Sequence, residues 1–257
     1  EIGALADAIE SIGFECTRCG GCCTGYAPDE PGGAPANESG DEATSTSDDE
    51  TTAPQESPST DPETGDDREP HTATVFPDEV RELVEAAEST PEEAADVAYD
   101  WRDVARPMPY GLSEDADGQP VGETFEWALA TDGCGDCTFY EESDGQGACT
   151  VHDARPLICQ TYPFSVALGG TTQPMGEAVD AEGMVRAHEC EGLGRDISRE
   201  DAEKLAAALK ERAIRELEEA IGVRDTYDPT AADRANTDLV VFDSEGPKRS
   251  DGEPVDG

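Results

Sequence analysis

Nine cysteines carry the most distinctive chemistry in this sequence, and they fall into two groups. The first group is a C-x2-C-x2-C-C run, and the second is spread over a longer stretch downstream. In chain order the nine are Cys16, Cys19, Cys22, Cys23, Cys134, Cys137, Cys149, Cys159 and Cys190. A two-residue spacer lets two sulfurs point at one ion from a single turn, and the same spacing occurs in iron–sulfur ligation. The pattern predicts metal binding and leaves zinc and an iron–sulfur cluster both open.

Three other interpretations of the cysteines stay open. A disulfide framework suits small secreted domains, but the count is odd and no secretory signal precedes the first group. Cysteines can also be small buried apolar residues, which fits Cys134 better than the crowded first group. Cys134 and Cys137 match the C-x-x-C of thioredoxin-like redox sites, although no βαβ pattern surrounds them. We favour metal ligation over all three.

Further motifs surround the downstream cysteines. They read Cys137-Thr-Phe-Tyr, Gly147-Ala-Cys149-Thr-Val-His152, Arg155-Pro156, Cys159 and Tyr162-Pro163-Phe164. Together with the C-x2-C-x2-C-C run, these motifs closely resemble the YkgJ-type cysteine-cluster family, whose members are described as zinc- or iron-chelating proteins. They are also similar to the cysteine-rich part of the flagellin lysine N-methylase FliB. The resemblance covers residues 14–26 and 134–194.

The resemblance implies eight metal-ligating cysteines and leaves Cys134 outside the set. The implied ligands are Cys16, Cys19, Cys22, Cys23, Cys137, Cys149, Cys159 and Cys190. Cys190 opens a Cys-Glu-Gly-Leu-Gly segment, like the family's final cysteine before a Gly-rich turn. We expect the segment 162–164 to form a hydrophobic plug beside the cluster.

Several polar side chains near the cysteines could support such a site. His152 stands where the family often has Tyr, and it is either a further ligand or a partly exposed residue in a turn. His188 is a second candidate ligand, whereas His71, beside an acidic stretch, is expected to play no part. Arg155 either compensates the negative charge of the thiolates or caps a turn before Pro156.

The chain is strongly acidic. Its 257 residues include 61 Asp and Glu against 17 Lys and Arg, which gives a formal net charge of −44. Such a charge repels phosphate backbones, and no run approaches the roughly 18 apolar residues that cross a bilayer. We therefore expect a metal ion as partner, neither nucleic acid nor a membrane, and a cytoplasmic location; the protein partner, if any, stays open. The preference for Arg over Lys indicates a halophile's cytosol, where salt screens self-repulsion.

Composition divides the chain into four parts. Residues 1–26 contain a helix and the first cysteine group. Residues 27–71 are acidic and poor in large apolar side chains, which predicts a disordered insert. Residues 72–223 form the rest of a single metal-binding domain. Residues 224–257 are expected to be an acidic C-terminal tail, in which 239–242 is either a short docking strand or part of the tail.

Apolar periodicity predicts the secondary structure. The expected helices span residues 1–14, 76–88, 90–104 and 198–221. Gly222 is expected to stop the last helix. Alternation predicts a strand from Val121 to Ala130, and residues 131–195, rich in Gly, Cys and Pro, are expected to be irregular. The predicted fold class is a small α+β, irregular, cysteine-rich and metal-stabilised domain with about four helices and a short sheet.

Three functions fit this pattern. The favoured one is a metal-binding protein that holds zinc or an iron–sulfur cluster through its two cysteine groups. The second is an enzyme, either an iron–sulfur oxidoreductase or a protein-lysine methyltransferase, the latter implied by the similarity to FliB. The third is a purely structural zinc module for protein interaction. No catalytic constellation is visible in the sequence, so whether the protein is an enzyme stays open.

Overall fold

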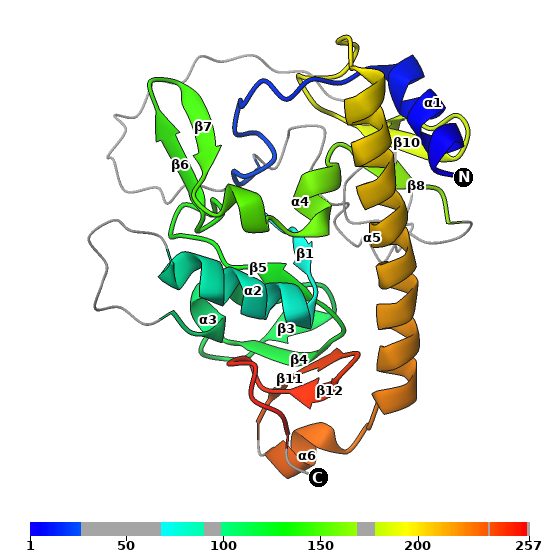
Figure 1. The fold of residues 1–257 in the computed structure, drawn as a ribbon. Coiled ribbons are helices and arrows are strands. Elements are labelled where there is room, and N and C mark those ends of the chain that lie inside the picture. The colour runs from blue at the N-terminus through cyan, green and yellow to red at the C-terminus, as the bar shows by residue number, and fades with distance from the viewer. Residues whose placement is uncertain (27–67, 90–98, 169–177, 236, 256–257) are drawn as a thin grey trace, which may run out of the picture.

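The described part of the chain folds into helices and small sheets (Figure 1), and its buried apolar residues form three hydrophobic cores. The computed structural model describes residues 1–26, 68–89, 99–168, 178–235 and 237–255. The described part contains six α-helices and four small sheets. The α+β class is therefore confirmed, while the expected four helices and one short sheet are too few. The predicted insert falls mainly on residues 27–67, which lie outside the described residues.

The first core lies between two long helices and an antiparallel sheet. Its elements are α1 (Ile2–Ile12), α5 (Arg199–Thr226), β8 (Phe164–Val166), β9 (Ala178–Asp180) and β10 (Val185–His188). Leu5 and Ile9 point from α1 into this core, as their helical spacing predicts, and Leu209 faces them from α5. Ser198 caps α5 by accepting a hydrogen bond from the backbone N–H of Asp201.

The second core is the largest, and it lies under α2 in the middle of the molecule (Figure 1). Its elements are α2 (Pro77–Glu88), α3 (Trp101–Val104), β1 (Thr74–Val75), β2 (Ala105–Pro107) and β5 (Trp127–Leu129). The strands form an antiparallel sheet in the order β1-β5-β2. Val80 and Leu83 from α2 are fully buried against Trp127 and Leu129 from β5.

The third core is built by the C-terminal segment. Its elements include α6 (Ala231–Ala235) and β11 (Leu239–Asp243). β11 belongs to a four-stranded sheet with β12 (Gly246–Lys248), β4 (Pro120–Thr124) and β3 (Leu112–Glu114). β11 pairs parallel with β4 and antiparallel with β12, and Val240 and Phe242 are fully buried. The docking-strand alternative is therefore confirmed, and the description of 224–257 as a tail needs correction because apolar burial holds this segment in the fold.

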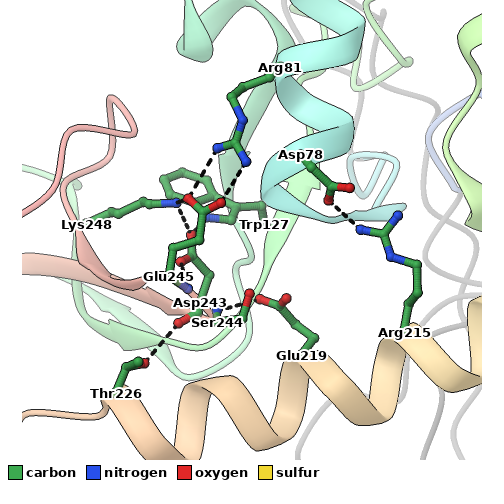
Figure 2. A network of polar contacts seen from close by, with 10 residues as sticks. All are labelled: Asp78, Arg81, Trp127, Arg215, Glu219, Thr226, Asp243, Ser244, Glu245 and Lys248. Atoms are coloured by element: carbon green, nitrogen blue, oxygen red, sulfur yellow. Dashed lines mark hydrogen bonds and ion pairs between the residues drawn. The ribbon is translucent and has the colours of Figure 1, made fainter.

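A polar network also fastens the C-terminal strands to the rest of the chain (Figure 2). Asp243 accepts hydrogen bonds from the Trp127 indole at 2.8 Å and the Lys248 ammonium at 2.7 Å. Lys248 also pairs with Glu245 at 2.7 Å. The guanidinium of Arg81 on α2 donates two hydrogen bonds to the Glu245 carboxylate, at 2.6 and 3.2 Å. The network therefore links β5, α2 and the β11–β12 hairpin.

Three expectations for the secondary structure need correction. The strand expected over 121–130 is split between β4 and β5, which belong to different sheets. Gly222 does not stop α5, which continues to Thr226. A Cβ at position 222 would lie 2.4 Å from the Cβ of Ser244, so the glycine allows the helix to pack closely against Ser244. The helix expected over 90–104 is described only as α3, and residues 90–98 lie outside the described residues.

Residues 131–195 are not irregular throughout. Beyond β8–β10 they contain β6 (Tyr140–Ser143), β7 (Gln146–Cys149), the 3-10 turn η1 (His152–Ala154) and α4 (Leu157–Thr161). These elements are short, so they give little periodicity for a sequence pattern to reveal. In the part of the chain that the structure describes, none of the helices combines the length and apolar character needed to span a membrane.

Candidate metal centre

The start of the first cysteine group pairs with the chain that follows Cys190. Phe14 forms an antiparallel bridge with Leu193, and the backbone N–H of Glu15 donates to the Gly192 carbonyl at 3.0 Å. The backbone N–H of Gly192 in turn donates to the Cys190 sulfur at 3.4 Å. Because the pairing is antiparallel, Cys16 continues toward the segment that holds Cys190.

The C-x2-C-x2-C-C loop lies against the β6–β7 hairpin. The Gly147 N–H donates to the Arg18 carbonyl at 2.8 Å, and the Cys137 N–H donates to the Cys23 carbonyl at 2.7 Å. A Cβ on Gly20 would lie 2.2 Å from the Tyr140 hydroxyl, and its φ of +80° also favours glycine. Only a glycine at position 20 lets the loop approach the hairpin this closely.

The second cysteine group is spread over the hairpin and α4. Cys137 precedes β6 and is buried, Cys149 ends β7 and pairs with Tyr140, and Cys159 lies in α4. Cys137 belongs to the largest core, and Cys23, Cys149 and Cys159 pack against that core. Three downstream cysteines and one from the first group therefore adjoin the same core.

Glu79 holds α4 in place. Its carboxylate accepts hydrogen bonds from the backbone N–H of Phe76 at 3.0 Å and of Leu157 at 2.9 Å. These N–H groups lie at the starts of α2 and α4, so one buried carboxylate satisfies both helix ends. At the other end of α4, Thr161 accepts a hydrogen bond from the buried Arg212 of α5 at 3.1 Å. In Figure 1, α4 accordingly lies beside α5.

The close spacing and the burial of these cysteines disfavour the deprotonated, negatively charged form of their thiols. The Cys22 and Cys23 sulfurs lie 3.8 Å apart, and the hydrogen bond between them, followed by burial, raises the pKa of Cys22. Burial raises the pKa of Cys137 to about 11. Burial also raises the pKa of Cys159, and the neighbouring thiolates of Cys137, Cys22 and Cys149 raise it further. A bound cation would relieve this repulsion.

Arg155 opposes the repulsion, as expected for a charge-compensating residue. Its positive charge lowers the pKa values of Cys22, Cys149 and Cys159, although burial and, at Cys22, the hydrogen bond to Cys23 outweigh it. Its own guanidinium donates to the His152 carbonyl at 3.1 Å. Arg155 therefore also stabilises the turn that precedes α4.

Two tyrosines, Tyr26 and Tyr162, lie close enough to the cysteines to feel their charge. Burial raises the pKa of Tyr26 to about 12, and the Cys22 thiolate adds to the shift. Burial and then the Cys190 thiolate raise the pKa of Tyr162, whose hydroxyl donates to the Glu189 carbonyl. Phe164 of the expected plug is fully buried in the α1–α5 core, where its ring meets Phe14 edge-on at 5.7 Å.

The histidines and Cys134 lie in different surroundings. His152 is exposed, and its ring lies 3.5 Å from Asp153. His188 is buried, and its Nε2 lies 2.9 Å from the Ser165 hydroxyl. His71 is buried beside Arg106, which donates to its carbonyl at 2.8 Å. Cys134 is exposed in a turn.

The donor set fits a thiophilic metal in its chemistry. All nine cysteines are free thiols, so the disulfide framework is not observed. Zn–S bonds of about 2.3 Å in a tetrahedron place sulfurs about 3.8 Å apart, which is the separation of Cys22 and Cys23. Among the described residues, no group of three or more His, Cys, Asp or Glu side chains already converges on one point as metal ligands would. We therefore identify the candidate centre from the backbone contacts between the cysteine segments and from the thiol chemistry of its residues.

Sequence patterns did not reveal the residues that support this centre. Glu79 follows Pro77 in a helix start, a signal for a cap on its own helix, but nothing in the sequence indicates its second bond to α4. Tyr140 ends the Cys137-Thr-Phe-Tyr motif, but nothing in the sequence indicates its close contact with Gly20.

Comparison with known proteins agrees with the cysteine pattern. Residues 15–191 match the model of the CxxCxxCC family, described as "Putative zinc- or iron-chelating domain". This match covers more than half of the chain, so the chain belongs to the CxxCxxCC family. No curated protein and no solved structure matches the chain significantly.

Proposed function

We propose that this protein binds zinc or iron through the thiolates of eight cysteines in two groups. The proposed ligands are Cys16, Cys19, Cys22, Cys23, Cys137, Cys149, Cys159 and Cys190. The observation that carries the proposal is the contact between the two groups, in which the N–H of Cys137 donates to the carbonyl of Cys23 at 2.7 Å. Membership of the CxxCxxCC family supports the same class of metal.

The chain's own residues would prepare the centre for a cation. Gly20 and Tyr140 hold the C-x2-C-x2-C-C loop on the hairpin, and Glu79 fixes the start of α4, which carries Cys159. Arg155 offsets part of the charge of the thiolates. A bound metal would supply the remaining positive charge and cross-link segments that lack a large apolar interior of their own.

Metal analysis of matched cysteine variants tests this proposal. The protein is purified without oxygen in high salt, and bound zinc and iron are measured by elemental analysis. Cys19→Ala combined with Cys22→Ala is expected to lower bound metal by at least half, while Cys134→Ala, which removes an exposed thiol outside the proposed set, keeps the wild-type content. Equal metal content in all three proteins would show that the first group does not bind metal.

An absorption spectrum of the same samples decides between the two metals. An iron–sulfur cluster gives visible thiolate-to-iron bands, whereas a zinc protein is colourless. The oxidoreductase alternative depends on the iron form, so a colourless protein with stoichiometric zinc would exclude it and leave the structural zinc module. Methyl transfer to lysine-bearing proteins is a separate alternative, and it is tested by a direct assay with S-adenosylmethionine.

A further inference from the structure

Four of the eight candidate ligands adjoin one hydrophobic core, and the residues that flank two others contact a different core. The largest core, under α2, contains Cys137 and is contacted by Cys23, Cys149 and Cys159. The α1–α5 core is contacted instead by Phe14 and Leu193, the bridged pair that flanks Cys16 and Cys190. The thiols therefore lie along a boundary between two separately packed parts of the molecule.

The inner side of this boundary holds three downstream thiols. Cys137 and Cys149 flank one hairpin, in which the Tyr140 N–H donates to the Cys137 carbonyl at 2.9 Å and Tyr140 pairs with Cys149. Cys159 packs against the same core from α4. Cys137 is buried, and Cys149 and Cys159 are half-buried, so this set is shielded from solvent.

The outer side holds the other three thiols. Cys16 and Cys19 are exposed, and Cys190 is half-buried. The antiparallel pairing of residues 13–15 with 192–194 brings Cys16 toward Cys190. Cys19 follows Cys16 after the two-residue spacer that lets two sulfurs point at one ion. Cys16 also borders a surface depression that it shares with Asp196 and Leu205.

Cys22 and Cys23 lie between the two sets. Their sulfurs are 3.8 Å apart, and both residues are half-buried. The Cys23 carbonyl accepts a hydrogen bond from the N–H of Cys137 of the inner set at 2.7 Å, and Cys22 follows Cys19 of the outer set by three residues. An adjacent pair in this position can give one thiolate to each side, which completes two sets of four.

We infer that the protein holds two metal ions at two sites of different accessibility. The inner site uses Cys137, Cys149 and Cys159, the outer site uses Cys16, Cys19 and Cys190, and each takes its fourth thiolate from the Cys22–Cys23 pair. This inference rests on the proposed function. The inner site is the more buried of the two, and the outer site, with two exposed cysteines, is the one that exchanges its metal with solvent.

Zinc loading and zinc transfer test the two-site arrangement. The full chain is reconstituted with Zn²⁺ in high salt, bound zinc is counted by elemental analysis, and zinc transfer to the chromophoric chelator 4-(2-pyridylazo)resorcinol is followed over time. Wild type is expected to bind two zinc ions and to release them in a fast and a slow phase of equal amplitude. Cys16→Ser with Cys190→Ser is expected to keep one zinc ion and to lose only the fast phase.

The controls separate this inference from the proposed function. Cys134→Ser is expected to keep both ions and both phases. Cys149→Ser with Cys159→Ser is expected to lose the slow phase. If this variant fails to fold, the zinc content and release phases of Cys16→Ser with Cys190→Ser decide whether there are two sites. A wild type that binds one ion, or an outer variant that loses all its zinc, would overturn the two-site inference but leave metal binding intact. A wild type that binds no zinc or iron would overturn both.

Discussion

Burial controls the protonation of His71. The side chain is 4% exposed, and its Nδ1 has no hydrogen-bond partner among the described residues. Burial, and then the positive charge of Arg106, lower the pKa of His71 to about 4, and Asp136 opposes the shift only weakly. The histidine is therefore neutral at pH 7 in the folded protein.

Replacing His71 is expected to remove one pH-dependent part of the stability. Between pH 6.5 and 4 the unfolded chain binds a proton that the folded chain excludes, so this contribution is complete above about pH 6.5 and is lost as the pH falls toward 4. A shift of this size corresponds to about 3 kcal/mol. We expect the free energy of unfolding of wild type to fall over this range by about that much more than that of His71→Gln.

The matched control for this measurement is the exposed His152. Denaturant unfolding is measured at several pH values for wild type, His71→Gln and His152→Gln. His152→Gln is expected to follow the pH dependence of wild type because its ring is in solvent. Parallel curves for wild type and His71→Gln would contradict the assignment of the low pKa to His71.

At this scale the sequence predicts the candidate ligands better than their surroundings. The spacing of Cys16, Cys19, Cys22 and Cys23 is a local pattern, and residues one or three apart stay neighbours in almost any fold. His71 shows the opposite case. Its burial depends on contacts with Arg106 and Gly135, which are distant in sequence, so no local pattern could indicate it.

Glu79 joins two elements that are far apart in the chain. The start of α2 and the start of α4 each present backbone N–H groups without partners inside their helices, and the Glu79 carboxylate accepts one from each. Burial raises the pKa of this carboxyl, while the two backbone hydrogen bonds lower it. Because α4 carries Cys159, the hydrogen bond from Leu157 to Glu79 also helps to position a candidate metal ligand.

Glu79→Ala is expected to lower the free energy of unfolding by about 3 kcal/mol, because it leaves two buried N–H groups without acceptors. Zinc affinity should fall as well, since the start of α4 loses its anchor. Glu79→Gln is expected to lie between wild type and alanine, because its amide keeps one acceptor oxygen. Denaturant unfolding and competitive zinc titration measure the two effects.

The exposed Glu82 on the same helix provides the control for this prediction. Glu82→Ala changes the same residue type without removing a cross-element bond, so its stability and zinc affinity should stay near wild type. An equal decrease in stability and zinc affinity in Glu79→Ala and Glu82→Ala would mean that the effect comes from removing a negative charge from α2, and not from losing the hydrogen bond to Leu157.

Element prediction succeeded where one face of an element is buried. The spacing of Leu5 and Ile9 identified α1, and the alternation at Trp127 and Leu129 identified β5, because each pattern follows one continuous core. It failed at Gly222, where the propensity of glycine to end helices was overridden by close packing against Ser244. Tertiary contact decides such positions, and a single sequence does not show the contact.

Charge shapes the whole molecule in two ways. The formal net charge of −44 disfavours a compact state in dilute buffer, so we expect thermal stability to rise with salt, as a high-salt habitat would require. Some of the cations join distant parts of the chain, as Arg81 does with Glu245 and Arg215 does with Asp78. Lys248 is 4% exposed and pairs within the β11–β12 hairpin with Asp243 and Glu245, and Arg81 of α2 contacts the same Glu245 (Figure 2).

Lys248→Met is expected to lower the free energy of unfolding by about 3 kcal/mol, because it leaves the buried Asp243 carboxylate without its cation. The loss should persist at high salt, since mobile ions screen a buried pair poorly. Lys204 is the matched control. It also pairs with two carboxylates, Glu200 and Asp201, but its side chain is 66% exposed. Lys204→Met is therefore expected to leave stability nearly unchanged.

Denaturant unfolding at low and high KCl separates the general charge effect from the buried pair. Screening should raise the stability of wild type and both variants together, because all three carry nearly the same net charge. The gap between Lys248→Met and wild type should stay constant across the salt series. A gap that closes at high KCl would mean that Lys248 acts only by diluting the acidic charge, and that apolar burial alone holds the C-terminal strands in place.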